Sequence, residues 1–279
     1  MPSWTFRKGD WQPAGSTAQL RGWAVKRVRK ALQLVGYDLR RLSQPPWVYD
    51  PLQAERRLLQ HIDRPVILDA GANVGQTLEK YALAFPTARI HSFEPFPDSF
   101  ERLRETAVAR PPAMAYQMAL GEEAGEADFH VNQAYHTRNS LLVRPKSGRR
   151  YYRDGSELPD TVRVNVVTLD EFCARAAIER INLLKLDVQG AELQVLRGGR
   201  RLLEKQAIDL IFTEIMFVPH YEDGPLFNDI HSALSNYDYS LYGLYDLIVA
   251  SNGQVRYANA LYLTPKFRAT VLNNFPPEP

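Results

Sequence analysis

Residues 66–75 read Val-Ile-Leu-Asp-Ala-Gly-Ala-Asn-Val-Gly, and residues 90–95 read Ile-His-Ser-Phe-Glu-Pro. The apolar run at the start of the first stretch predicts a buried parallel strand, and the small residues after it predict a tight turn before a helix. Glycines in such a turn let a ligand approach the backbone N–H groups at the start of the helix. Glu94 ends the next strand, where a carboxylate can accept hydrogen bonds from both hydroxyls of a ribose. The two stretches therefore predict a βαβ unit that binds a ribose-containing ligand.

The glycine spacing argues against a dinucleotide. A dinucleotide fingerprint needs a third glycine for the pyrophosphate, and position 76 is Gln. Asp69, Gly71 and Gly75 instead form Asp-x-Gly-x-x-x-Gly, which resembles motif I of the class I S-adenosylmethionine-dependent methyltransferases. The alternative for this segment alone is a structural turn in another α/β protein.

Length and composition set broad limits. A chain of 279 residues has room for one large α/β domain with additions. Its net charge of +2 gives no global signature of a nucleic-acid-binding protein. The single cysteine, Cys173, excludes an internal disulfide and suits a buried structural thiol. Because no apolar run approaches ~20 residues and the first residues lack an apolar signal core, we expect a cytoplasmic protein without a membrane span.

The chain divides into three predicted regions. Residues 1–49 form an extension, residues 50–268 form the α/β domain, and residues 269–279 form a tail. Within the extension, apolar residues recur at helical spacing over residues 21–42, and the other faces carry seven basic residues against Asp38. Such a basic amphipathic helix can dock on a partner protein or on an anionic membrane. Docking on a membrane would place the protein at the inner membrane face. The alternative is a helix that packs on its own domain with a solvated basic face.

Strand and helix patterns alternate through the domain. The predicted core strands are 66–70, 89–93, 113–119, 181–187, 208–216, 239–248 and 258–263. The predicted helices are 75–84, 98–108, 169–177, 191–205 and 225–236. Residues 129–131 and 162–167 read as antiparallel strands around a polar insertion at about 132–160. Seven core strands in this order favour a doubly wound α/β sheet.

A longer motif in the second half is more specific. Residues 181–199 read Ile-Asn-Leu-Leu-Lys-Leu-Asp-Val-Gln-Gly-Ala-Glu-Leu-Gln-Val-Leu-Arg-Gly-Gly. With the motifs Phe93-Glu-Pro, Met118-Ala-Leu-Gly and Val167-Thr-Leu-Asp, the chain resembles the FkbM family of methyltransferases over about residues 60–265. The resemblance implies the class I methyltransferase fold, a Rossmann-like seven-stranded sheet of order 3-2-1-4-5-7-6 with the last strand antiparallel. It also implies transfer of a methyl group from S-adenosylmethionine to oxygen, often to a sugar hydroxyl in a glycan or to a secondary metabolite.

The resemblance also implies cofactor-binding residues. Their shared feature is a position at or after a predicted strand end. They are the turn residues Asp69, Gly71, Ala72, Asn73 and Gly75; Glu94 with Pro95 for the ribose; Ala119 and Leu120 for the adenine edge; and Asp187 beside the transferable methyl group.

The catalytic candidates follow from the reaction. A sugar hydroxyl is a weak nucleophile, so methyl transfer to it benefits from a base or a metal ion. Asp187 and Glu214 end adjacent predicted strands and could share a proton or a divalent cation such as Mg²⁺. His136 and His220 lie in flanking loops and are alternative bases, although a lone loop histidine is more often a surface residue. Gln189 opens the helix after Asp187 and is a candidate contact for the substrate.

The insertion at 132–160 is the candidate substrate lid. Arg149 and Arg150 could hold a phosphate, and Tyr151 and Tyr152 could stack on a sugar. These side chains suggest a phosphorylated acceptor, such as a nucleotide sugar or a lipid-linked glycan. The alternative is a solvated loop.

The sequence thus predicts an O-methyltransferase for a sugar hydroxyl in a glycan, glycolipid or nucleotide sugar. One alternative is an O-methyltransferase for a polyketide or other secondary metabolite. Another is a catalytically silent binding module in a glycan-assembly complex, docked through residues 21–42. A nucleic-acid base methyltransferase is disfavoured, because residues 187–190 read Asp-Val-Gln-Gly rather than Asp/Asn-Pro-Pro-Tyr/Phe.

Overall fold

The computed structural model describes residues 28, 30, 48–131, 139–142 and 160–272. The chain falls into two units, Met1–Pro46 and Trp47–Pro279. Positions 28 and 30 of the first unit are helical. The second unit contains the sheet and the candidate site, and the rest of this section concerns that unit.

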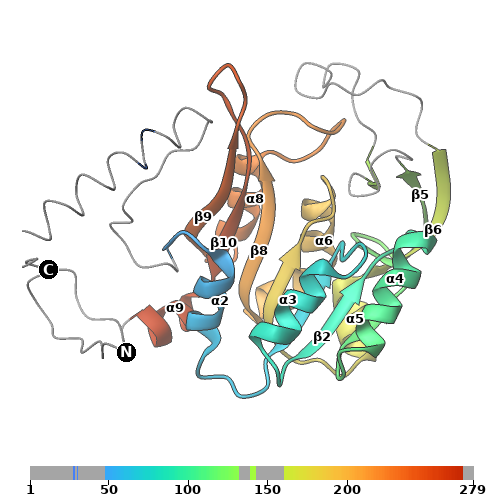
Figure 1. Cartoon of the computed structure of the whole chain (residues 1–279), viewed down its shortest axis with the longest axis horizontal. Helices are drawn as coiled ribbons and strands as arrows, with labels where there is room; N and C mark the ends of the chain where they lie inside the picture. Colours follow the sequence, from blue (N-terminus) through green and yellow to red (C-terminus); the bar gives the residue numbers. More distant parts are fainter. Residues whose placement is uncertain (1–27, 29, 31–47, 132–138, 143–159, 273–279) are drawn as a thin grey trace, which may run out of the picture. The chain divides into compact units, whose positions relative to one another are not determined.

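A seven-stranded sheet forms the centre of the second unit (Figure 1). Its strands, in spatial order, are β3 (Met114–Tyr116), β2 (Arg89–Phe93), β1 (Val66–Ala70), β7 (Ile181–Leu186), β8 (Ile208–Met216), β10 (Val255–Leu263) and β9 (Ser240–Val249). The pairs from β3 to β8 are parallel, and β10 is antiparallel to both of its neighbours. The predicted order 3-2-1-4-5-7-6 is therefore confirmed, and the fold is that of a class I methyltransferase.

Helices cover both faces of this sheet (Figure 1). One face packs against α2 (Pro51–Leu59), α3 (Gln76–Ala84), α4 (Pro97–Val108) and α9 (Pro265–Leu272). The other packs against α5 (Leu169–Arg175), α6 (Glu192–Gly198), α7 (Arg200–Glu204) and α8 (Phe227–Ser235). Alternate residues of the apolar central strands serve the two cores, as Leu183 and Leu184 do. Cys173 is buried in the second core, as expected.

The predicted strand 113–119 is wrong. The structure has two strands there, β3 and β4 (Ala119–Gly121), and they belong to different sheets. The chain turns between them, where the Met118 N–H donates to the Tyr116 carbonyl at 3.0 Å. Strand β4 pairs with β6 (Asp160–Thr168), which also pairs with β5 (Gly125–Val131). The β5–β6 pair is antiparallel, as predicted.

The predicted helix 191–205 is also interrupted. Helix α6 ends before Gly199, and α7 begins after it. The Asp170 carboxylate accepts hydrogen bonds from the Arg201 and Leu202 N–H groups at 2.9 and 3.1 Å. These bonds satisfy N–H groups that a continuous helix would pair internally, so a distant side chain starts the second helix. In the described part of the chain, no helix is both long and apolar enough to cross a membrane.

A buried glutamate lies between α2 and α3. Glu55 is 1 % exposed, and its Oε1 accepts a hydrogen bond from the Tyr81 hydroxyl at 3.3 Å. Burial raises the pKa of Glu55 from 4.5 to about 8, against the opposing effect of the Tyr81 hydrogen bond. The folded protein therefore holds a proton on Glu55 at neutral pH that the unfolded chain releases.

Glu55→Gln should remove a pH dependence of stability. The free energy of unfolding of the parent protein falls as pH rises from 4.5 to about 8, because the folded state alone retains the proton. The glutamine variant should lie within about 1 kcal/mol of the parent at pH 5 and exceed it at pH 9 by up to about 4 kcal/mol. Urea unfolding from pH 5 to 9 measures this difference. Glu101→Gln, which alters an exposed ion pair with Arg104, is the control and should follow the parent. Parallel curves for Glu55→Gln and the parent would contradict the prediction.

Candidate functional site

The carboxyl ends of β2, β1 and β7 lie level with one another and with Thr213, which is three residues before the end of β8. Ala70 of β1 pairs with Phe93 of β2 and with Leu186 of β7, and Leu186 pairs with Thr213 of β8. The next residues along these strands are Gly71, Glu94, Asp187 and Glu214. The register therefore sets four predicted site residues side by side, at the edge where ligands bind in open α/β sheets.

Gly71 lets the ends of β1 and β7 approach closely. Its φ is +77°, and a Cβ at this position would lie 2.0 Å from the carbonyl oxygen of Asp187. The N–H groups of Gly71 and Ala72 both donate to the Phe93 carbonyl, at 3.0 and 2.9 Å. The Asp187 N–H donates to the Ala70 carbonyl at 3.1 Å. Only glycine fits this turn. The hydrogen bond from Asp187 to Ala70, just before the turn, then holds the backbone of Asp187 in place.

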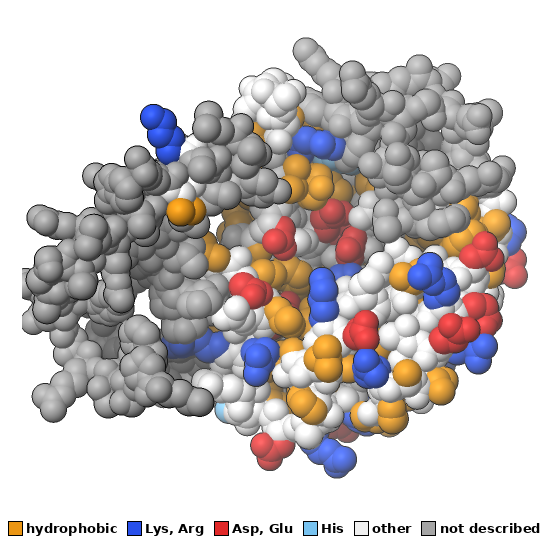
Figure 2. Space-filling model, in the orientation of Figure 1, with side chains coloured by type: hydrophobic (Ala, Val, Ile, Leu, Met, Phe, Trp, Pro, Cys, Tyr) orange, Lys and Arg blue, Asp and Glu red, His pale blue; other side chains and the backbone are white. Residues whose placement is uncertain are grey.

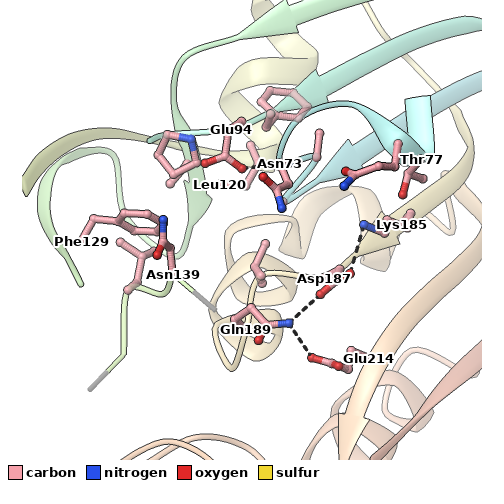
Figure 3. Close-up of a pocket in the computed structure, with 18 of the residues that line it drawn as sticks. Asn73, Thr77, Glu94, Leu120, Phe129, Asn139, Lys185, Asp187, Gln189 and Glu214 are labelled. Carbon is pink, nitrogen blue, oxygen red and sulfur yellow. Dashed lines mark hydrogen bonds and ion pairs between the residues drawn. The ribbon is translucent and has the colours of Figure 1, made fainter. Parts of the chain in front are cut away.

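A cavity of about 480 Å³ opens over this edge. Figure 2 shows acidic side chains gathered around a hollow, and Figure 3 shows the residues that line it. The predicted residues in its lining are Gly71, Ala72, Asn73, Glu94, Pro95, Ala119, Leu120, Asp187, Gln189 and Glu214. Its size lies within the range of small-molecule sites.

Glu94 is held at one end of the cavity. Its Oε2 accepts a hydrogen bond from the Asn73 N–H at 2.9 Å, and its Oε1 accepts one from the Phe96 N–H at 3.0 Å. Burial raises the pKa of Glu94 to about 7, although the two backbone hydrogen bonds favour the ionised form. Each carboxylate oxygen keeps acceptor capacity for a ligand hydroxyl.

A lysine absent from the predicted set lies under the other end. Lys185 Nζ is 3.1 Å from Asp69 Oδ1 and 3.5 Å from Asp187 Oδ2. The Lys185 and Asp69 side chains are 8 % and 0 % exposed, whereas the Asp187 side chain is 44 % exposed. Burial opposes the charge of Lys185, but the two carboxylates outweigh it and raise the pKa of Lys185. The ammonium group therefore keeps its proton and cannot act as a base.

The sequence pattern could have identified Lys185 as a buried, paired charge. It is the one charged residue in the apolar strand Ile181–Leu186. A charge in a buried strand needs a partner, and the adjacent parallel strand supplies Asp69. Asp69 consequently lies beneath the cavity and does not line it.

An amide links Asp187 and Glu214 in the cavity lining (Figure 3). Gln189 Nε2 donates to Asp187 Oδ1 at 2.8 Å and to Glu214 Oε2 at 3.1 Å. The buried Glu192 side chain accepts hydrogen bonds from the Val188 and Gly190 N–H groups at 3.1 and 3.0 Å. Burial raises the pKa of Glu192 to about 7, despite these backbone hydrogen bonds. Glu192 thus supports the loop that carries Gln189.

Other predicted residues do not line the cavity. Gly75, with φ +95°, is the N-cap of α3. His220 is 3 % exposed, with its Nδ1 2.9 Å from the Val218 carbonyl, and its ring packs on Tyr257. The predictions for His136, Arg149, Arg150, Tyr151 and Tyr152 fall outside the described residues.

Part of the cavity lining was not predicted from the sequence. Gln76, Thr77 and Lys80 come from the first turns of α3, and Phe129, Asn139 and Leu141 come from β5 and the segment 139–142. Helical spacing from the glycine turn could have identified the first three. Among the described residues, no group of three or more His, Cys, Asp or Glu side chains is placed to hold a metal ion.

The known proteins that this chain resembles are methyltransferases. The profile of the methyltransferase FkbM domain matches residues 69–241. The chain is 29 % identical over 178 residues to the 2-O-methyltransferase NoeI of Sinorhizobium fredii, covering 61 % of this chain and 72 % of NoeI. It is 32 % identical over 181 residues to the 31-O-demethyl-FK506 methyltransferase FkbM of Streptomyces tacrolimicus, covering 56 % and 69 % of the two chains. It is 24 % identical over 212 residues to the hexuronic acid methyltransferase AglP of Haloferax volcanii, covering 71 % and 81 %.

Proposed function

Because the chain belongs to the FkbM family of methyltransferases, we propose that it transfers a methyl group from S-adenosylmethionine to a hydroxyl group of a carbohydrate. One observation carries this proposal. A single cavity has a buried carboxylate at the end suited to a ribose and two further carboxylates at the end suited to the reacting hydroxyl. The alternative of a dehydrogenase lacks support, because the Gly71 turn has no third glycine for a pyrophosphate.

The residues along the cavity fit the parts of S-adenosylmethionine in order. Glu94 would accept the ribose hydroxyls, and the apolar side chains of Leu120 and Phe129 would contact the adenine. Thr77 and Lys80 lie near the amino end of α3, where the helix dipole and the lysine charge favour the carboxylate of the methionine part. When bound, S-adenosylmethionine supplies an electrophilic methyl group.

The residues at the other end would activate the acceptor. Asp187 follows the end of β7 and lies level with Glu214 of β8, and the half-exposed Asp187 side chain lines the cavity. Asp187 would accept the proton of the attacking hydroxyl. Lys185 would hold the Asp187 carboxylate in place through an ion pair with Asp187 Oδ2. Holding the hydroxyl in line with the methyl group is the larger part of the task for such a displacement.

The relatives favour an oxygen acceptor of two kinds. NoeI is named for a 2-O position, which favours an oxygen acceptor, and AglP is named for a hexuronic acid, which favours a sugar acceptor. The FkbM relative is named for a position on FK506, so a polyketide hydroxyl is the second candidate. On the sequence argument, Arg149 and Arg150 would add affinity for a phosphorylated sugar.

An acceptor panel tests the proposal. The protein is incubated with methyl-labelled S-adenosylmethionine and with free sugars, nucleotide sugars, lipid-linked glycans or polyketides. We expect label in an alkali-stable methyl ether on a sugar compound. Label only on a polyketide would select the second candidate, and label in an alkali-labile ester or on nitrogen would refute transfer to a hydroxyl.

Glu94→Gln should weaken cofactor binding and remove its pH dependence. Glutamine keeps the shape of the side chain but lacks the charge that strengthens hydrogen bonds from the ribose hydroxyls. Affinity for S-adenosylmethionine at pH 8 should fall about tenfold, which is about 1.4 kcal/mol. In the parent protein, affinity should rise from pH 6 to 8 as Glu94, with its pKa of about 7, loses its proton. Calorimetric titration of both proteins measures these effects.

The control for this prediction is Glu123→Gln. Glu123 is exposed and does not line the cavity, so its variant should bind the cofactor like the parent at both pH values. Unchanged affinity of Glu94→Gln at pH 8 would remove Glu94 from the cofactor site.

A further inference from the structure

An asparagine outside the large sheet completes one wall of the cavity. Asn139 lines the cavity, although it is only 8 % exposed. Figure 3 shows it near Phe129, on the side of the cavity that also carries Leu120 and Glu94, whereas Asp187 lies on the opposite side. Asn139 therefore belongs to the end of the cavity that is suited to the adenosine part of the cofactor.

The neighbouring residue holds Asn139 in this position. Ser140 forms an antiparallel bridge with His130 of β5, in which the two N–H···O distances are 2.8 and 3.1 Å. The Ser140 hydroxyl also donates to the Gln189 carbonyl at 2.6 Å. Because the backbone and the side chain of Ser140 are attached to two different elements, the position of Asn139 is set before a ligand binds.

The wall around Asn139 is otherwise apolar. Phe129 and Leu141 line the cavity and pack with Ala119 in one apolar cluster. Among the described residues between positions 95 and 141 that line the cavity, Asn139 is the one with a polar side chain. Apolar side chains can contact the faces of a purine ring, but they do not distinguish the polar groups along its edge. Any recognition of that edge by a side chain of this wall falls to Asn139.

The amide of asparagine matches the edge of adenine. Adenine has a 6-amino group, which donates hydrogen bonds, next to a ring nitrogen, which accepts them. An asparagine side chain presents an acceptor oxygen and a donor nitrogen in one plane, and asparagine pairs with adenine in this way in protein–DNA complexes. A site with such a polar group rejects an analogue that lacks the matching group, because the buried amide then loses its partner.

We propose that Asn139 recognises the adenine of S-adenosylmethionine, accepting a hydrogen bond from the 6-amino group and donating one to the adjacent ring nitrogen. The specificity for adenine then comes from the segment 139–142 and not only from the ends of the central strands. The inference rests on the cofactor of the proposed function and is independent of the acceptor.

A pair of ligands tests the inference without turnover. Calorimetric titration gives the affinities for S-adenosylhomocysteine and for an analogue with purine in place of adenine, which lacks only the 6-amino group. The parent should bind S-adenosylhomocysteine about tenfold more tightly than the analogue. Asn139→Leu keeps a similar side-chain size without hydrogen-bonding groups, and its two affinities should agree within about twofold. A general change in the shape of the pocket affects both ligands and cancels from this ratio.

Two further variants sharpen the comparison. Asn139→Asp keeps an acceptor for the 6-amino group, so it should retain a preference for S-adenosylhomocysteine even where both affinities change. Asn228→Leu is the matched control, because Asn228 is exposed in the first turn of α8 and does not line the cavity. It should show the preference of the parent.

The outcomes separate this inference from the proposed function. Equal affinities of the parent for the two ligands would overturn the inference, and so would an undiminished preference in Asn139→Leu. If Asn139→Leu does not fold, Asn139→Ala should show the same loss of preference, and a retained preference in that variant would overturn the inference. The expected ratios without methyl transfer to a hydroxyl would refute the proposed function and leave the inference standing. A parent that binds neither ligand would overturn both.

Discussion

Replacing Asp187 with asparagine should lower the rate of methyl transfer by about 10²- to 10⁴-fold, the usual contribution of a general base. The asparagine oxygen can still accept the hydrogen bond from Gln189, so the loop and the cavity should keep their shape. In the proposed mechanism, the variant can no longer take the proton of the acceptor hydroxyl. Affinity for S-adenosylmethionine should therefore remain within a few-fold of the parent, and steady-state kinetics with calorimetry separates the two effects.

Asp128→Asn is a suitable control for the loss of a carboxylate. Asp128 is exposed and pairs with Arg163 on the small sheet, so its replacement should change neither rate nor affinity. Full activity of Asp187→Asn would exclude Asp187 as the base. A large loss of cofactor affinity in that variant would assign Asp187 to cofactor binding instead.

Replacing Lys185 with methionine should lower the free energy of unfolding by about 3–5 kcal/mol, because it leaves the fully buried Asp69 without its ion-pair partner. The double variant Asp69→Asn with Lys185→Met removes both charges and should recover most of that loss. This pattern distinguishes an unpaired charge from simple loss of packing, which the double variant would not repair. Urea unfolding of the parent, the two single variants and the double variant forms the thermodynamic cycle.

Lys205→Met provides the matched control. Lys205 is exposed at the end of α7, and its replacement should change stability by less than about 0.5 kcal/mol. A similarly small change in Lys185→Met would show that Asp69 is satisfied by other means. An unrepaired double variant would point to packing of the lysine stem.

The sequence predicted the features that depend on local pattern. The limits of β8 match the predicted strand 208–216, and the order of the seven core strands is confirmed. The error at 113–119 arose because an apolar run does not show where a strand changes partner, and β4 pairs with β6 rather than β2. Local pattern therefore located the sheet but not the division of this segment between two sheets.

The part of the candidate site that could be predicted is the part whose residues are placed by the parallel strands. Glu94 and Asp187 lie together because β2 and β7 end at the same edge, and the register of β7 with β8 places Glu214 at the same level. The partnership of Lys185 with Asp69 and the bridging position of Gln189 depend on side-chain directions across neighbouring elements. Motif spacing along one chain does not contain those directions, so the sequence could name Gln189 but could not assign its hydrogen bonds.

The hydrogen bond from Ser140 to Gln189 has a consequence for protein engineering. The segment 139–142 is attached on one side by the pairing of Ser140 with His130, and on the other by its hydroxyl on the Gln189 carbonyl. A chimera that exchanges the flanking sequences 132–138 and 143–159 for those of a relative, and retains residues 139–142, would preserve both attachments. The segment 139–142 thus marks a natural junction for exchanging the flanking sequences while the contact with the Gln189 loop is kept.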